Sequence, residues 1–160
     1  MFIHQLGTGL VVLALAFAAA GFVLSLLGGL YQRADMIEAG RRSTLAVFTL
    51  TTCAVVAMQY AIHTHEFYLA YVYQISDRAM PFQYLTSSMW GGMAGSLLFW
   101  AWVLSAYSAA AMIWARKRLP DILPFANTAL LGTWMLFGTL LWLEASPFEL
   151  LKDSVSGLAL

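Results

Sequence analysis

The chain has 160 residues, of which 61% are hydrophobic and 10% are charged, and its formal net charge is zero. Soluble domains carry about 25% charged residues, so this composition indicates a membrane protein. A zero net charge removes the electrostatic basis for binding nucleic acid. The single cysteine, Cys53, excludes a disulfide framework or a cysteine-based metal site built from this chain alone.

Four apolar segments are long enough to span a bilayer, which requires about 20 residues per helix. They lie at about 6–30, 43–62, 93–115 and 122–143. The N-terminus lacks the basic residues and the cleavage site of a signal peptide, so we expect the first segment to remain as a membrane anchor. The sequence therefore predicts an all-α polytopic membrane protein, in which residues 1–160 form a single module with four transmembrane helices.

Each predicted helix carries a face of small or polar side chains. In the first helix, small residues recur at spacings of three and four, which places them in one stripe suited to helix packing. In the second, Thr52, Gln59 and His63 share a face, and polar side chains at membrane depth should face protein. The small stripe of the first helix consists of Ala14, Ala18, Gly21, Ser25 and Gly28, and that of the third of Ala94, Ala101, Ser105 and Ser108. We therefore expect a helical bundle, or part of one.

Basic residues are concentrated in the first and last connections between the helices. Those of the first connection are Arg33, Arg41 and Arg42, and those of the last are Arg116, Lys117 and Arg118. The middle connection carries only Arg78, and the C-terminal tail carries only Lys152. The positive-inside rule therefore places the two basic connections in the cytoplasm or matrix and both termini outside, in the periplasm or intermembrane space.

The middle connection, 63–92, is long and rich in aromatic residues. Such a segment should lie along the membrane surface or dock on a partner. Whether residues 66–75 are helical or extended stays open, because both periodicities leave apolar residues on both faces. At its end, Trp90 suits the membrane boundary, and Gly91-x-x-x-Gly95 lets helix backbones approach closely. We expect a helix to enter the bilayer there, with a flat contact patch in its first turn.

Two groups of titratable residues could carry chemistry. His63 and His65 could hold a metal ion or ligate haem iron. Residues two apart do not share a helix face, however, so an interface cluster is favoured over a ligand set, and the same holds for His4. Glu144 could belong to a proton path, but the Ser-Pro pair that begins at Ser146 favours a helix end at the headgroup level.

Three strings, in chain order, resemble the N-terminal part of the CcmF family. They are Phe67-Tyr-Leu-Ala-Tyr-Val-Tyr-Gln-Ile-Ser76, Trp90-Gly-Gly-x-x-Gly-Ser-Leu-Leu-x-Trp100 and Ser146-Pro-Phe-Glu149. CcmF proteins are haem lyase membrane proteins of cytochrome c maturation, which help to attach haem to apocytochrome c outside the membrane. The family usually carries His-Glu where this chain has Met93-Ala94, so a polar role of that pair does not carry over.

The family is also much longer, and its tryptophan-rich haem-handling segment and haem-ligating histidines lie beyond the point that corresponds to Leu160. The resemblance therefore implies an N-terminal part or split subunit of a CcmF-like haem lyase, with haem bound mainly by residues outside this chain and no catalytic set within it. The implied partners are membrane lipid, the remaining lyase polypeptide or other cytochrome c maturation proteins, and apocytochrome c. The implied location is the bacterial inner membrane or the mitochondrial inner membrane.

The resemblance also implies a candidate haem-proximal surface. It consists of Trp90, Gly91, Gly92, Gly95 and Ser96. A tryptophan can stack on a porphyrin, and glycines allow close approach. The alternative for these residues is helix packing alone. The alternative for the whole chain is a packing or proton-path subunit of a respiratory or transport complex.

Overall fold

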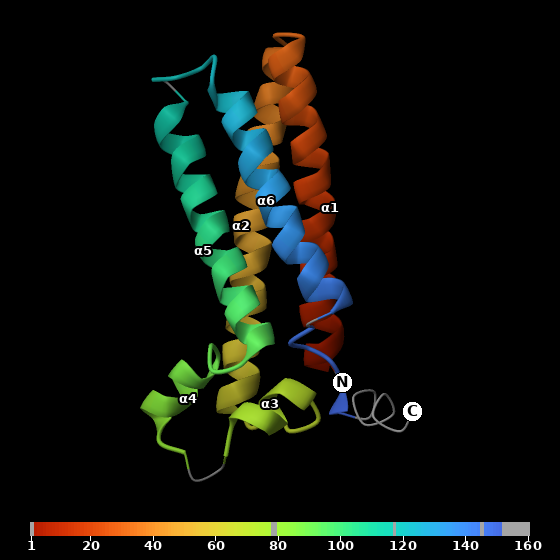
Figure 1. The fold of residues 1–160 in the computed structure, drawn as a ribbon, viewed down its shortest axis with the longest axis vertical. Helices are drawn as coiled ribbons and strands as arrows, with labels where there is room; N and C mark the ends of the chain where they lie inside the picture. Colours follow the sequence, from red (N-terminus) through yellow and green to blue (C-terminus); the bar gives the residue numbers. More distant parts are fainter. Residues whose placement is uncertain (1, 78–79, 117, 145, 152–160) are drawn as a thin grey trace.

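The computed structural model describes residues 2–77, 80–116, 118–144 and 146–151, and it is a bundle of long helices (Figure 1). The long helices are α1 (Phe2–Leu30), α2 (Ala34–His63), α5 (Met93–Ala115) and α6 (Leu123–Leu143), and the short ones are α3 (Ala70–Ile75) and α4 (Phe82–Ser88). All four long helices are long and apolar enough to cross a membrane. The predicted all-α fold with four transmembrane helices is confirmed. Arg78, Lys117 and Lys152, which entered the charge comparison, lie outside the described residues.

Two predicted helix starts are wrong, because α1 begins at Phe2 and not near residue 6, and α2 also begins earlier than predicted. The second helix begins at Ala34 and not near residue 43, so Arg41 and Arg42 lie within α2 and not in a connection. Arg41 donates hydrogen bonds of 2.9 and 2.7 Å to the two carboxylate oxygens of Glu38, and Arg42 donates one of 3.2 Å. Hydropathy missed these first turns of α2, about two and a half in number, because the charges interrupt the apolar run. The pairing of the charges at spacings of three and four supports the helix.

The small-residue stripe of α1 is buried along its whole length, as predicted. It packs mainly against α2, where a side chain on Gly21 would place its Cβ 2.7 Å from the Cβ of Ser43. A Cβ on Gly28 would lie 2.8 Å from the backbone nitrogen of Ile37. Close approach of the two backbones therefore requires these glycines.

The polar face of α2 is turned towards protein, as predicted. The hydroxyl of Thr52 accepts a 3.0 Å hydrogen bond from the indole of Trp102 on α5. The side-chain amide of Gln59 donates to the carbonyl of Thr86, and His63 lies 3.3 Å from the Thr86 hydroxyl.

A buried polar cluster joins three of the long helices. The Asn127 amide of α6 donates to the hydroxyl of Ser25 on α1 at 2.8 Å. Its carbonyl accepts from the hydroxyl of Thr44 on α2 at 2.6 Å. All three side chains are buried. At membrane depth such hydrogen bonds fix which helix faces meet, because lipid offers no competing partner.

We expect Asn127→Ala to lower the free energy of unfolding by about 1–2 kcal/mol, since it removes two interhelical hydrogen bonds. Thermal unfolding in detergent measures the change. The matched control is Thr133→Ala, because the exposed Thr133 hydroxyl bonds only to Ala129 of its own helix. Equal effects of the two substitutions would contradict the structural role of the cluster.

The connection between α2 and α5 folds over one end of the bundle, which we call the loop end (Figure 1). Here α3 begins at Ala70, so the segment left open by the sequence is a turn followed by a short helix. The Ala70 amide donates to the carbonyl of Glu149 at 2.9 Å, and Leu69 pairs with Leu150 in an antiparallel bridge. The aromatic connection thus docks on its own chain, close to residues from both ends of the described sequence.

Candidate functional site

A cleft of about 220 Å³ opens at the loop end, between α3, the start of α5 and the segment after α6. Its lining is Ala70, Tyr71, Gln74, Ile75, Gly92, Met93, Ala94, Glu144, Ser146 and Glu149. All three strings that resemble the CcmF family contribute to it, although they lie far apart in the sequence. We call it the loop-end cleft.

Tyr71 holds the walls of the loop-end cleft together. Its side chain is buried, and its hydroxyl donates to the carbonyl of Met89 at 2.6 Å. The same oxygen accepts from the backbone amide of Gly92 at 3.2 Å. Burial raises the pKa of Tyr71 above that of a free phenol, which keeps the neutral hydroxyl that both hydrogen bonds require. Tyr71 belongs to the first of the three strings, but no local pattern in the sequence predicts this structural role.

The glycines of the second string make room for Tyr71. A Cβ on Gly92 would lie 2.8 Å from its ring, and a Cβ on Gly95 would overlap both the Met89 carbonyl and the Tyr71 hydroxyl. The flat helical patch expected from Gly91 and Gly95 does not form, because α5 begins at Met93 and Gly91 precedes it. The close approach is therefore made within the chain, to a tyrosine and not to a second helix.

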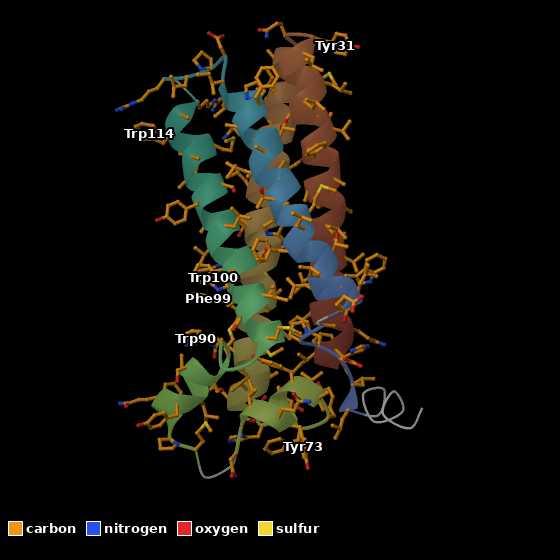
Figure 2. The ribbon with its side chains drawn as sticks, in the orientation of Figure 1. Tyr31, Tyr73, Trp90, Phe99, Trp100 and Trp114 are labelled. Carbon is orange, nitrogen blue, oxygen red and sulfur yellow. The ribbon has the colours of Figure 1, made fainter. Side chains whose placement is uncertain are left out.

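Trp90 lies at the mouth of α5, where the sequence placed an aromatic anchor (Figure 2). Its side chain is 47% exposed, and its ring lies 5.2 Å from that of Phe99 in a tilted arrangement. The Ser96 hydroxyl donates to the Trp90 carbonyl at 2.9 Å and so fixes the backbone of this turn. Of the five candidate residues, Gly92 lines the loop-end cleft, whereas Trp90 and Gly91 are exposed and do not line it.

The histidines are held by separate neighbours. His63 stacks on Phe82 with a ring separation of 4.6 Å, and His65 stacks on Phe67 at 5.6 Å. Nδ1 of His4 donates to the carbonyl of Phe148. In the part of the chain that the structure describes, no three His, Cys, Asp or Glu residues come together as a possible metal site.

Two carboxylates give the loop-end cleft its charge. Glu144 follows the last residue of α6, which confirms that it marks a helix end, and Glu149 lies on the segment beyond. Both side chains are exposed. The cleft therefore presents negative charge and hydrogen-bonding groups, and its lining residue Gly92 lies two residues after the exposed Trp90.

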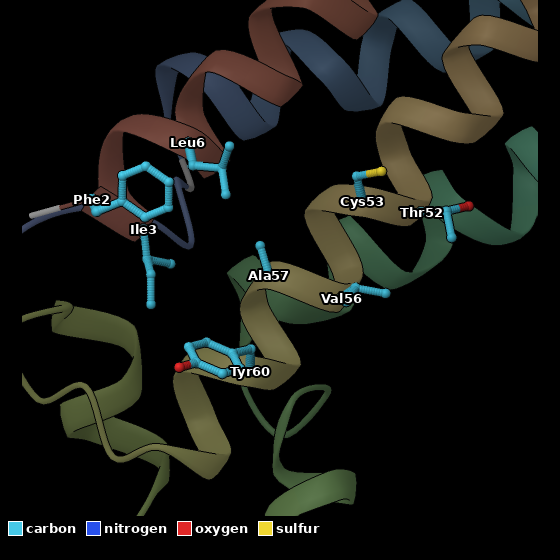
Figure 3. A pocket seen from close by; sticks show the side chains of 8 residues that line it. All are labelled: Phe2, Ile3, Leu6, Thr52, Cys53, Val56, Ala57 and Tyr60. Atoms are coloured by element: carbon cyan, nitrogen blue, oxygen red, sulfur yellow. The ribbon is translucent and has the colours of Figure 1, made fainter.

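A second hollow lies within the bundle's apolar surface (Figure 3). This groove of about 500 Å³ runs between the start of α1 and the second half of α2. Its lining is Phe2, Ile3, Leu6, Thr52, Cys53, Val56, Ala57 and Tyr60. The lining is compatible with a lipid acyl chain and contains no carboxylate like those of the loop-end cleft, so this groove is not part of the candidate site.

No family model matches the sequence. The chain is 33% identical to the cytochrome c-type biogenesis protein CcmF of Pseudomonas fluorescens over 93% of its length, and 29% identical to the cytochrome c-type biogenesis protein ccl1 of Rhodobacter capsulatus over 95%. It covers 23% of each of these relatives. A solved structure of the cytochrome c haem lyase CcmF matches with a TM-score of 0.85 and 30% identity, over 93% of this chain and 25% of that one.

Proposed function

The chain belongs to the CcmF family, to whose N-terminal region it corresponds, and from this premise we propose that it is a membrane module of cytochrome c maturation. Because it spans about a quarter of the length of its relatives, we assign it a positioning role within a larger haem lyase. The observation that carries this proposal is the convergence of the three resembling strings on the loop-end cleft.

The described residues fit a surface beside haem better than a pocket around it. The loop-end cleft, at about 220 Å³, is smaller than the roughly 300–1,000 Å³ of pockets that enclose drug-sized ligands. Glu144 and Glu149 would also repel the propionates of a haem buried there. We therefore propose that haem is bound mainly by other polypeptide and contacts this chain at the exposed side of Trp90.

The five candidate residues take two roles in this proposal. Trp90 and Gly91 would form the surface that faces haem, where an indole can stack on a porphyrin. Gly92, Gly95 and Ser96 would hold that surface in place through Tyr71 and the Trp90 carbonyl. Apocytochrome c and the remaining lyase polypeptide are the proposed partners, and the chemistry of thioether formation would lie on that polypeptide.

We propose the bacterial inner membrane as the location, with the loop end on the periplasmic side. The opposite end carries Arg33, Arg116 and Arg118 in its connections and Arg41 and Arg42 in the first turns of α2. The positive-inside rule assigns this basic end to the cytoplasm. Of the alternative functions, a proton path lacks support, because the described parts of the long helices carry acidic groups only at Asp35 and Glu38.

Deletion of the gene in its native host tests the proposal. We expect covalently haem-bound c-type cytochromes to be lost, while apocytochrome c is still exported and b-type cytochromes remain. Haem-stained gels and immunoblots measure the two forms, and a plasmid copy of the chain should restore the mature form. Undiminished c-type cytochromes in the deletion strain would overturn the proposed function.

The exposed indole gives a residue-level prediction. Trp90→Ala should lower mature cytochrome c by about two- to tenfold, the effect of losing an aromatic contact worth about 0.5–1.5 kcal/mol. The amount of the chain in the membrane should not change. Trp142→Ala is the matched control, since Trp142 is equally exposed near the loop end of α6. Equal losses of cytochrome in the two variants would contradict a special role of Trp90.

A further inference from the structure

Four bulky side chains recur every seven residues along the exposed face of α5. Met93, Trp100, Tyr107 and Trp114 are 71, 58, 74 and 61% exposed. Seven residues make nearly two helical turns, so these side chains form one row along the helix, which we call the α5 row. Figure 2 shows Trp100 and Trp114 on the side of the bundle that faces away from α1.

The hydroxyl of Tyr107 would be unfavourably exposed to hydrocarbon if lipid covered the α5 row. It lies eight residues before the end of α5, or about 12 Å along the axis, and helical side chains lean towards the N-terminus of their helix. Its hydroxyl is therefore directed to the middle of the membrane and away from the nearer boundary. Tyrosine is favoured at membrane boundaries, and an unpaired hydroxyl in hydrocarbon is costly. A hydrogen-bond partner from another polypeptide would remove that cost.

The surface beside the α5 row is hollow. A groove of about 270 Å³ runs between α5 and α6, lined by Trp100, Val103, Leu104, Tyr107, Thr133 and Phe137. The hydroxyl of Thr133 is satisfied by its own helix. The groove thus offers an apolar channel with the Tyr107 hydroxyl at its edge, which is the shape that the ridge of another helix fills.

We propose that the α5 row and this groove bind a transmembrane helix of a larger polytopic partner, the polypeptide that supplies the rest of the haem lyase. The identity of the partner rests on the proposed function. The chain spans about a quarter of its relatives' length, and under the proposed function the rest of the lyase is a membrane polypeptide that packs against it. At Met93 the row reaches the loop-end cleft, so a helix docked here stands beside the candidate site.

The composition of α5 argues against a second copy of this chain as the occupant. Two copies meeting face to face would need small residues at their contact to bring the backbones together. Gly95, Ala101 and Ser105 of α5 are buried within the bundle, and the exposed Ala110 lies between the bulky side chains of Tyr107 and Trp114. The partner helix must therefore supply the small side chains opposite the tryptophans, together with a hydrogen-bond acceptor at the depth of Tyr107.

Site-specific photocrosslinking in native membranes tests this surface. The photoreactive amino acid benzoylphenylalanine replaces Tyr107 in one strain and Phe17, an exposed aromatic residue of α1, in a control strain. We expect the Tyr107 probe to crosslink to a transmembrane segment of one larger polytopic polypeptide, identified by mass spectrometry, and the Phe17 probe not to do so. Adducts with lipid alone, or with a second copy of this chain, would overturn the proposal.

Alanine substitutions measure the strength of the contact. Trp100→Ala and Trp114→Ala should each reduce the amount of the crosslinked partner that co-purifies by about tenfold, as for single hot-spot tryptophans. Trp142→Ala, on α6, should leave it unchanged. Full co-purification by both α5 variants would refute the docking surface.

Assays of c-type cytochromes in the same strains separate the two proposals. If the Tyr107 probe crosslinks to a polytopic partner but c-type cytochromes stay normal after deletion of the gene, the docking surface is supported and the proposed function is rejected. Loss of cytochromes on deletion, without a polypeptide crosslink at Tyr107, would reject the surface alone.

Discussion

Gly95→Leu should abolish maturation of c-type cytochromes and destabilise the chain by about 3 kcal/mol or more, the upper range for overpacking a filled site. A Cβ at this position already overlaps the Met89 carbonyl and the Tyr71 hydroxyl, and neither can move freely because they are hydrogen bonded to each other. A leucine must therefore push α3 away from the start of α5. Thermal unfolding in detergent and haem-stained gels measure the two effects.

Gly9→Leu is the matched control for Gly95→Leu. Gly9 also lies in a transmembrane helix, but a Cβ there meets no atom within 4 Å. This variant should unfold at nearly the wild-type temperature and support normal cytochrome levels. Gly95→Ala should fall between the two, since it adds the overlapping atom without the rest of the side chain. If Gly95→Leu unfolded at the wild-type temperature, that result would contradict the tight contact between Tyr71 and the start of α5.

The parts of the fold that follow from local patterns could be predicted. The predicted third helix has the bounds of α5, and the fourth differs from α6 by one residue at its start. The buried stripe of α1 follows from its spacing of small residues, because such spacing fixes a helix face regardless of its partner. The start of α2 could not be found by hydropathy, since charged residues continue the helix beyond the apolar run.

The candidate site depended on contacts that no local pattern contains. Reading Gly91 and Gly95 as one helical patch assumed that both lie in the same helix. The position at which α5 begins instead reflects Tyr71, a residue of α3 that bonds to the backbone of Met89 and Gly92. The three strings marked the right segments of the sequence, but their meeting in one cleft is a tertiary result. Their proximity to haem stays a prediction.

Phe148→Ala should lower the free energy of unfolding by about 3–5 kcal/mol, the usual cost of truncating a fully buried phenylalanine. Phe148 is 0% exposed, and its ring lies directly against Gly7 of α1. Its carbonyl accepts a hydrogen bond from His4, and that of Glu149 accepts one from Ala70. The phenylalanine therefore anchors the segment that forms one wall of the loop-end cleft, and cytochrome levels should fall together with stability.

A double-mutant cycle with Gly7 tests whether that anchor is specific. Gly7→Ala alone should destabilise the chain, because its Cβ would overlap the Phe148 ring, whereas Gly9→Ala should not. Once Phe148 is replaced by alanine, the added methyl of Gly7→Ala has room, so the second substitution should cost little. The two free-energy changes should therefore be non-additive by about 1 kcal/mol or more. Strict additivity would mean that Phe148 and Gly7 do not touch, and the cleft would lose the wall formed by Ser146 and Glu149.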